Sequence, residues 1–392
     1  MKDAIVITHL GLVHALGDDP QAVFDSLAAG RQGLTRGSDG TESAPVSQDL
    51  RVLLGNGKKQ GFTRSSLLAG AACRRLWQAW AKDTGQPPAA AETGLVTGFT
   101  PDIYSDTILQ VLSTREYHLM SPFFFLNLSA NATASQVSIL LGIQAFILTM
   151  STGHTAGLEA LETACRVLST GRARQVAAGA VQEISARMVR GFSGPGAPPG
   201  SGTGILEGWR PGAVDLGEGS AWMFLLRADE ARQQGLRPRA RLCGFGMAYN
   251  PEAAGQGDPR ACNQAIAAAL ADAGWKAGDV EAVFLAANGD PAQDQAEMES
   301  MKNVFGNQRP PMTALKGALG ETWHAAGAMA AVLAILCLEH RLLLPTQRLP
   351  SSGAARELYL PMTARPLNAR RAMVMALDQD RKAMACLLEL PA

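Results

Sequence analysis

The sequence lacks three features that would each point to a particular class of protein. Its 392 residues carry 35 Lys or Arg and 35 Asp or Glu, so it has no basic excess of the kind that nucleic-acid-binding proteins show. Its longest apolar run, residues 325–338, is shorter than the roughly 20 residues that a membrane-spanning helix needs. Its first residues form a strand-like run without the features of a signal peptide. We therefore expect no nucleic-acid partner, no membrane span and a cytoplasmic location.

The cysteines and histidines also lack the spacings that metal sites or disulfide frameworks require. None of the cysteines forms a CxxC pair; they are Cys73, Cys165, Cys243, Cys262, Cys337 and Cys386. His9, His14, His118 and His340 show no metal-ligand spacing. The glycine- and proline-rich run at residues 194–200 has the wrong spacing for a dinucleotide-binding loop. We expect reduced thiols, no metal and no cofactor.

What the sequence does contain is a regular alternation of strand and helix signals, which predicts an α/β protein. Hydrophobic residues make up 47% and charged residues 18%, enough for a large core. Residues 35–60 and 194–212 are predicted loops. Strands are predicted at residues 4–13, 93–97, 145–150, 176–180, 239–247, 282–287 and 311–315. Helices are predicted at residues 21–29, 65–81, 104–119, 132–141, 155–169, 263–273, 296–305 and 323–341.

One pattern occurs in both parts of the chain: a short strand runs into a turn of small residues, and a buried helix follows. In the first part the strand Ala145–Met150 leads into Ser151-Thr152-Gly153-His154 and the amphipathic helix Thr155–Ser169. In the second part Pro311–Leu315 precedes the apolar helix Trp323–Arg341. This repetition predicts two similar halves, residues 1–235 and 236–392.

Several short blocks resemble, in order and spacing, the type II β-ketoacyl-[acyl carrier protein] synthases. The blocks are Ser121-Pro122-Phe123-Phe124, Ser151-Thr152-Gly153-His154, Asp215–Ala221, Gly244–Met247, and Lys316 followed by Ala325–Ala328. The resemblance covers nearly the whole chain. It implies the thiolase fold, an α/β architecture of two similar halves in five layers, α-β-α-β-α. It also implies dimerisation through strands near the active site.

The resemblance locates the family's catalytic positions, and this chain has replaced each of them. Those enzymes use a Cys nucleophile at a helix N-terminus, where the thiolate is favoured, and two His residues. Here His154 stands for the Cys, Asn288 for the first His and Glu321 for the second, while Lys316 is retained. Charged residues at 378–382 replace a glycine-rich loop. None of these residues is therefore expected to be catalytic in condensation.

Two interpretations of the replaced positions follow from these residue types. In the first, His154, Asn288 and Glu321 form a mutually hydrogen-bonded polar plug in a vestigial pocket. In the second, His154 acts as a base that Glu321 orients, as in hydrolases. A third, minor reading gives the imidazole chemistry to His324, should the helix register differ by one turn.

A subunit that keeps this scaffold but lacks the catalytic Cys and the two His residues resembles a chain-length factor. Such a subunit pairs with an active ketosynthase as a heterodimer and shapes the tunnel for the growing chain. The resemblance implies a role in bacterial type II polyketide or polyene biosynthesis, of which aryl polyene formation is one candidate. The expected partners are the ketosynthase and an acyl carrier protein with a phosphopantetheine-linked acyl chain. Within residues 104–136, the candidates for lining the interface and tunnel are Phe123, Phe124, Phe125 and Asn131.

Two rival functions remain open from the sequence. One is a homodimeric acyl-thioester hydrolase or malonyl decarboxylase that uses His154 and Glu321. The other is a structural or carrier-protein docking subunit, which would need a basic patch to bind an acidic carrier protein. Candidate basic clusters are Arg237/Arg239/Arg241 and Arg370/Arg371.

Overall fold

The computed structural model describes residues 4–37, 40–55, 61–99, 118, 127, 129–185, 188–189, 214–253, 255, 257–307, 309–349, 358, 360–379 and 381–391. The strands are β1 Ile5–His14, β2 Thr35–Arg36, β3 Glu42–Ala44, β4 Thr93–Gly98, β5 Phe146–Met150, β6 Gln175–Gln182, β7 Leu216–Gly217, β8 Gly219–Arg227, β9 Ala240–Tyr249, β10 Ala282–Leu285, β11 Met312–Ala314, β12 Leu342–Leu343, β13 Arg365–Pro366, β14 Arg371–Asp378 and β15 Lys382–Glu389. The α-helices are α1 Pro20–Ala28, α2 Leu50–Leu53, α3 Arg64–Thr84, α6 Ala132–Leu141, α7 Ala156–Ser169, α9 Ala228–Gln233, α10 Arg260–Ala273, α11 Pro291–Phe305, α12 Lys316–Leu319 and α13 Trp323–His340. Short 3-10 helices are η1 Ala90–Glu92 and η3 Ala277–Asp279.

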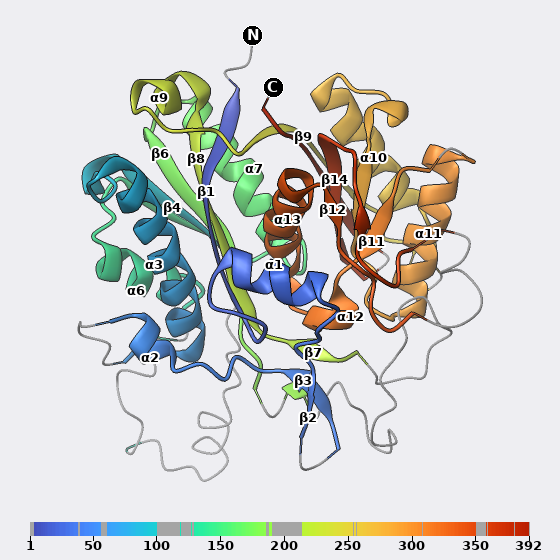
Figure 1. Ribbon diagram of the computed structural model, residues 1–392, viewed down its shortest axis with the longest axis horizontal. Coiled ribbons are helices and arrows are strands. Elements are labelled where there is room, and N and C mark those ends of the chain that lie inside the picture. Colours follow the sequence, from blue (N-terminus) through green and yellow to red (C-terminus); the bar gives the residue numbers. More distant parts are fainter. Residues whose placement is uncertain are drawn as a thin grey trace.

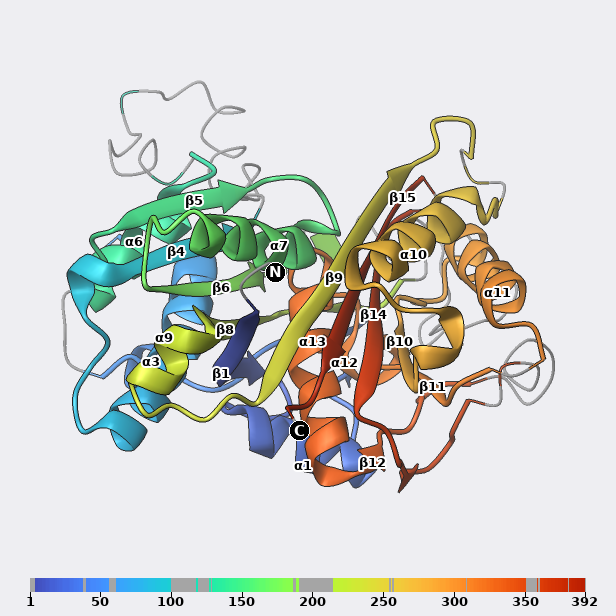
Figure 2. The same cartoon turned by 90° about the horizontal axis from the view of Figure 1, so that it is seen from above.

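Ten strands form one mixed sheet in the order β11-β10-β14-β15-β9-β1-β8-β6-β4-β5, which Figure 2 shows from above, and Figure 1 gives the overall view. The two ends of the sheet have the same pairing pattern: β10 lies parallel to β11 and β14, and β4 lies parallel to β5 and β6. All pairings in the middle, from β14 to β6, are antiparallel. Strands from the first part of the chain thus form one end of the sheet and strands from the second part form the other, each with the same internal order.

The helices pack in layers against this sheet. α7 and α13 contact each other and lie centrally, where α13 also contacts β6, β8 and β14 (Figure 2). α3 packs on the outer side of β1 and β8, and α10 packs on the outer side of β9 and β15. α13 is the one described helix that is long and apolar enough to cross a membrane, but 72% of it is buried inside the protein. It is therefore a core helix, as its run of apolar residues predicts.

The two central helices approach closely because each has a glycine at the contact. A Cβ on Gly157 of α7 would lie 2.6 Å from the backbone oxygen of His324, and a Cβ on Gly327 of α13 would lie 2.7 Å from the Leu158 side chain. Such distances leave no room for any larger residue. The crossing brings the N-termini of α7 and α13 to the same place in the molecule, beside the ends of β10 and β11.

The predicted strands and helices are present wherever the structure describes them, and their ends differ for local reasons. α11 begins at Pro291 rather than near residue 296, because the Asp290 side chain caps it by accepting from the backbone of Ala292 and Gln293. The predicted loop at 35–60 contains the short elements β2, β3 and α2. The predicted helix at 104–119 falls almost entirely outside the described residues. The boundary near residue 235 stays a prediction.

The close packing of α10 on β9 gives a test of the fold. A Cβ on Gly246 would collide with the backbone of Ala265 and Ala269 in α10. We expect Gly246→Ala to lower the free energy of unfolding by about 1–3 kcal/mol, because the helix must move away from the strand. Gly278→Ala is the control, since nothing lies within 4 Å of its new Cβ. Equal urea midpoints for the two variants would contradict the packing described here.

Candidate functional site: a polar cluster where two helices begin

The site lies at the carboxyl ends of parallel strands, where loops from distant parts of the chain meet. His154 lies in the turn between β5 and α7, and Asn288 follows β10. Lys316 is the first residue of α12, directly after β11, and Glu321 lies just before α13. The structure therefore brings together all four positions that the sequence singled out.

Glu321 is the centre of this site. Its side chain is fully buried, and its Oε2 accepts from Asn288 Nδ2 at 2.6 Å and from Lys316 Nζ at 2.7 Å. Its Oε1 accepts from the backbone nitrogen of Trp323 at 2.8 Å. Both carboxylate oxygens are thus hydrogen-bonded, as a buried charge requires.

The electrostatics of the cluster favour an ionised Glu321. Burial alone would raise the pKa of its carboxyl, but the Lys316 ammonium and the hydrogen bonds from Lys316 and Asn288 outweigh it and lower that pKa. Glu321 is therefore a carboxylate at neutral pH, paired with the ammonium of Lys316. A negative charge is fixed where the resembled synthases have their second histidine.

His154 occupies a different part of the site from the one that the plug hypothesis gives it. Its Nδ1 lies 3.6 Å from Asp378 Oδ1 at the end of β14, and its ring stacks on Trp323 with centroids 5.6 Å apart and an interplanar angle of 9°. Burial lowers the pKa of His154, although the charges of Glu321 and Asp378 act in the opposite direction. The ring is therefore mainly neutral at neutral pH.

These contacts correct the predicted plug. Asn288 and Glu321 do bond each other, but the carboxylate facing His154 within ion-pair distance is Asp378. The two carboxylate oxygens of Glu321 accept hydrogen bonds from Lys316, Asn288 and Trp323. The structure shows no hydrogen bond between His154 and Glu321. The reason is that His154 follows β5 and projects toward the end of β14, whereas Asn288 and Lys316 follow β10 and β11.

His324 does not offer a second catalytic imidazole here. Its Nδ1 lies 2.5 Å from Gln182 Oε1, at the end of β6. Its ring meets that of His154 edge to face, with centroids 6.5 Å apart. Burial lowers the pKa of His324 to about 4. A neutral, hydrogen-bonded ring at the start of a core helix is a structural group.

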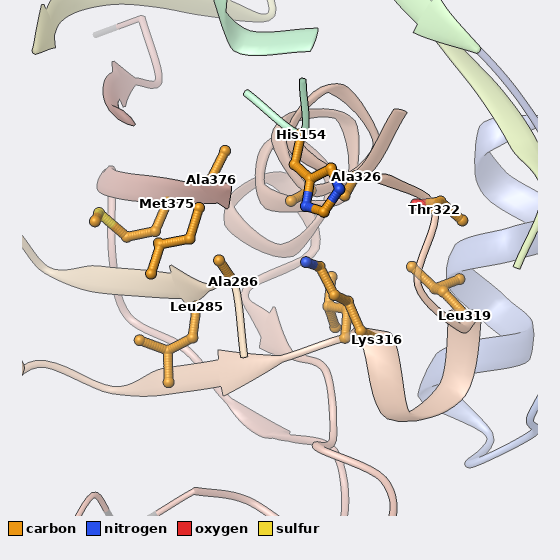
Figure 3. Close-up of a pocket in the computed structure, with 12 residues that line it drawn as sticks. His154, Leu285, Ala286, Lys316, Leu319, Thr322, Ala326, Met375 and Ala376 are labelled. Carbon is orange, nitrogen blue, oxygen red and sulfur yellow. The ribbon is translucent and has the colours of Figure 1, made fainter. Parts of the chain in front are cut away.

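The cavity beside these residues is small. It is lined by His154, Lys316, Thr322 and apolar side chains, and Figure 3 shows the Lys316 amino group pointing across it toward the imidazole of His154. Its volume is about 20 Å³. A cavity of that size holds a single water molecule, whereas ligand pockets measure several hundred Å³.

Glu297 is a further ionisable group near the site that the sequence analysis did not single out. It is fully buried on α11, its Oε1 accepts from Ala286 N at 2.8 Å, and burial raises its pKa to about 8. Its position three residues after Asp294, on the inner face of one helix, is the signal that would have found it. Asp294 in turn accepts from the backbone nitrogens of Asn288 and Gly289, which fixes the loop after β10.

Of the four candidates for lining the interface and tunnel, the structure describes only Asn131. Phe123, Phe124 and Phe125 lie outside the described residues. Asn131 is exposed at the start of α6 and makes no capping hydrogen bond with its side chain. Among the described residues, no group of His, Cys, Asp and Glu is arranged to hold a metal ion.

Two family models match this chain: the beta-ketoacyl synthase N-terminal domain over residues 2–231 and the beta-ketoacyl synthase C-terminal domain over residues 240–349. The chain therefore belongs to the beta-ketoacyl synthase family, and its mixed α/β architecture is the thiolase-like ketosynthase fold that the sequence predicted.

Several individual relatives are distant but match over most of their length. The chain is 25% identical to 3-oxoacyl-[acyl-carrier-protein] synthase 2 of Coxiella burnetii, covering 93% of each chain. It is 25% identical to the actinorhodin polyketide putative beta-ketoacyl synthase 1 of Streptomyces coelicolor, covering 96% of this chain and 86% of the relative. A solved structure described as the ishigamide ketosynthase/chain length factor matches with a TM-score of 0.88 at 18% identity over the full length of both chains, which establishes likeness of fold.

The buried Glu321–Lys316 pair gives a prediction about stability. Glu321→Gln leaves the Lys316 ammonium buried without its counter-charge, so we expect the free energy of unfolding to fall by about 3–5 kcal/mol at pH 7. Lys316→Met in the same chain should restore part of the loss, which a double-mutant cycle in urea measures. Glu299→Gln, which removes an exposed partner of Lys302, is the matched control. Additive losses would show that the two charges do not interact.

Glu297 gives a prediction about how the free energy of unfolding depends on pH. Because the pKa of its carboxyl is about 8 in the folded protein and near 4.5 when unfolded, the folded state holds the extra proton between these values. The contribution of Glu297 to stability therefore falls as pH rises from about 4.5 to 8. We expect Glu297→Gln to flatten the dependence of the unfolding free energy on pH in this range. An unchanged slope in urea unfolding between pH 5 and 8 would contradict the raised pKa.

Proposed function

We propose that this chain is a non-condensing ketosynthase-like subunit, a chain-length factor that pairs with an active β-ketoacyl-ACP synthase. In this role it shapes the acyl tunnel in bacterial type II polyketide or polyene biosynthesis in the cytoplasm, with aryl polyene formation as one candidate pathway. The observation that carries the proposal is the ionised, fully hydrogen-bonded Glu321 cluster at the place where the family has catalytic groups.

The chemistry of these residues argues against condensation by this chain. In the synthases that the chain resembles, a Cys takes the acyl group and two histidines promote decarboxylation and stabilise the enolate. Here a neutral imidazole replaces the thiolate, and a carboxylate replaces one of the histidines. A histidine can donate a hydrogen bond to the enolate oxygen, whereas an ionised carboxylate has no donor, so Glu321 cannot stabilise the enolate that the reaction requires.

The size of the cavity supports the same conclusion. About 20 Å³ next to His154 and Lys316 gives no room for an acyl chain or for the end of a phosphopantetheine arm. The growing chain would therefore be held by the partner, with this subunit supplying a wall of the tunnel. The same argument disfavours a hydrolase or malonyl decarboxylase that uses His154 and Glu321, since its substrate would need to reach both residues.

The surface through which a partner would bind is suggested by strand β5. It is the last strand of the ten-stranded sheet and forms its outer edge (Figure 2). Ile147 and Leu148 on this strand are 38% and 40% exposed, and Ile139 on the neighbouring α6 is 79% exposed. An apolar edge strand of this kind is a ready site for pairing with another chain. We place the ketosynthase contact here.

The basic clusters give little support to a docking role of their own. Arg239 pairs with Glu339, Arg241 pairs with Glu389, and Arg371 pairs with both Glu389 and Asp279. These arginines are thus largely neutralised by neighbours on the same surface. We propose that the acyl carrier protein, with its phosphopantetheine-linked acyl chain, binds the heterodimer mainly through the active ketosynthase.

The experiment that tests this function is reconstitution with a ketosynthase encoded beside this chain. We expect native mass spectrometry to show a one-to-one heterodimer, and malonyl extension on the carrier protein only when both chains are present. Phe124→Ala or Phe125→Ala should then change the length of the product. A stable homodimer that ignores the ketosynthase would refute the proposal, and binding without any effect on extension or product length would leave only a docking subunit.

The position of the interface has its own test. We expect Ile147→Glu together with Leu148→Glu to weaken the heterodimer at least tenfold, because two charges would be buried at the edge strand. Val52→Glu, on a residue that is 72% exposed on α2, is the control and should leave assembly unchanged. Equal dissociation constants for the wild type, the double variant and the Val52→Glu control would show that the interface does not include β5.

A further inference from the structure

The turn of the β14–β15 hairpin packs against the loop that carries His154. Lys382, the first residue of β15, donates from Nζ to the carbonyl oxygen of Thr152 at 3.0 Å and to Glu159 Oε1 at 2.6 Å. The hydroxyl of Thr155 donates to the same Glu159 oxygen at 2.5 Å. One side chain of the hairpin thus joins both the turn before α7 and the first turn of α7 itself.

The other strand of the hairpin meets the same loop. Asp378 lies opposite Lys382 in the antiparallel register of β14 and β15. Its carboxylate lies 3.6 Å from His154 Nδ1. Gly153 adopts a φ of +88°, and a Cβ there would collide with the Asp378 carboxylate. The positive φ favours glycine at this position, and the short distance shows how closely the Asp378 side chain approaches the loop. The hairpin therefore contacts the loop from both of its strands: Lys382 does so through two hydrogen bonds and Asp378 through close packing against Gly153 and His154.

The burial of these groups shows where the contact lies relative to the cavity. The side chains of His154 and Asp378 are 24% and 32% exposed, whereas those of Lys316 and Glu321 are 10% and 0% exposed. Leu377 and Ala376, which directly precede Asp378, line the cavity together with His154. The contact between loop and hairpin thus covers the cavity on its solvent side.

The strength of the contact comes from its partial desolvation. The side chains of Lys382 and Glu159 are 19% and 9% exposed. A charge-assisted hydrogen bond in such surroundings is stronger than one at the surface, and the Thr152 carbonyl adds a second bond to the same ammonium. Because the Lys382 ammonium makes both of these bonds, its removal should weaken the contact between the hairpin and the loop.

We propose that Lys382 and Asp378 form a latch that holds the β14–β15 hairpin over the cavity and closes it to thioesters from solvent. The latch is a property of this chain alone and keeps the loop from Thr152 to Thr155 in one conformation. It does not depend on the presence of a ketosynthase, so its test is separate from that of the proposed function.

Hydrogen exchange measured by mass spectrometry on the full chain tests the latch. Lys382→Met removes both bonds of the ammonium, and we expect amides in residues 151–157 and 372–379 to exchange about 10- to 100-fold faster. Lys302→Met, which removes an ion pair with Glu299 on the surface of α11, is the matched control and should leave both segments unchanged. Equal exchange in the two variants would overturn the latch.

Two more variants separate the latch from a general loss of stability. Lys382→Met leaves Glu159 mostly buried without a cation, so Glu159→Gln is combined with it. If the latch acts by joining the hairpin to the loop, the double variant should still exchange fast, and Lys382→Arg should exchange at nearly the wild-type rate. A double variant with wild-type exchange would show that the effect came from the stranded Glu159 charge, which would overturn the latch.

Access to the cavity gives an independent readout. Ala326 lines the cavity, and Ala326→Cys provides a thiol whose alkylation by iodoacetamide is followed by peptide mass spectrometry. We expect this thiol to be alkylated at least tenfold faster in the Lys382→Met background than in the Lys302→Met background. Equal rates in the two backgrounds would mean that the hairpin does not control access.

Discussion

The close crossing of α7 and α13 is the constraint on which the rest of this site depends. Gly157 and Gly327 let the two central helices touch, and this places both helix N-termini beside the ends of β10, β11 and β14. A bulkier residue at either glycine would force the helices apart. The loops that carry His154 and Glu321 would then separate, and the cluster around the cavity would lose its shape.

The site is organised around a fixed charge rather than around a reactive group. Glu321 is fully buried and has three donors, of which Lys316 carries the compensating charge. Such a pair is costly to break and gives little to a reaction that creates another anion nearby. The cluster therefore maintains the shape of the site, and under the proposed function the chemistry of condensation belongs to a partner.

The hairpin of β14 and β15 completes this arrangement. Lys382 and Asp378 stand where the resemblance to the synthases implies a glycine-rich loop, and both contact the loop of His154, Lys382 through hydrogen bonds. Side chains of this chain thus occupy the space in which a substrate would approach. Among the described residues, β5 is also an apolar strand at the edge of the sheet, with no further strand paired to it.

The sequence by itself determined the α/β layering, the family, and the positions His154, Asn288, Lys316 and Glu321, because each depends on local patterns and short motifs. Tertiary structure decided which partner each side chain takes. Lys316 and Glu321 are five residues apart and pair within one loop, whereas His154 and Asp378 are 224 positions apart and meet only because β5 and β14 end on the same side of the central helices. No local pattern encodes that meeting, since it depends on strand order and on how closely two helices can pack.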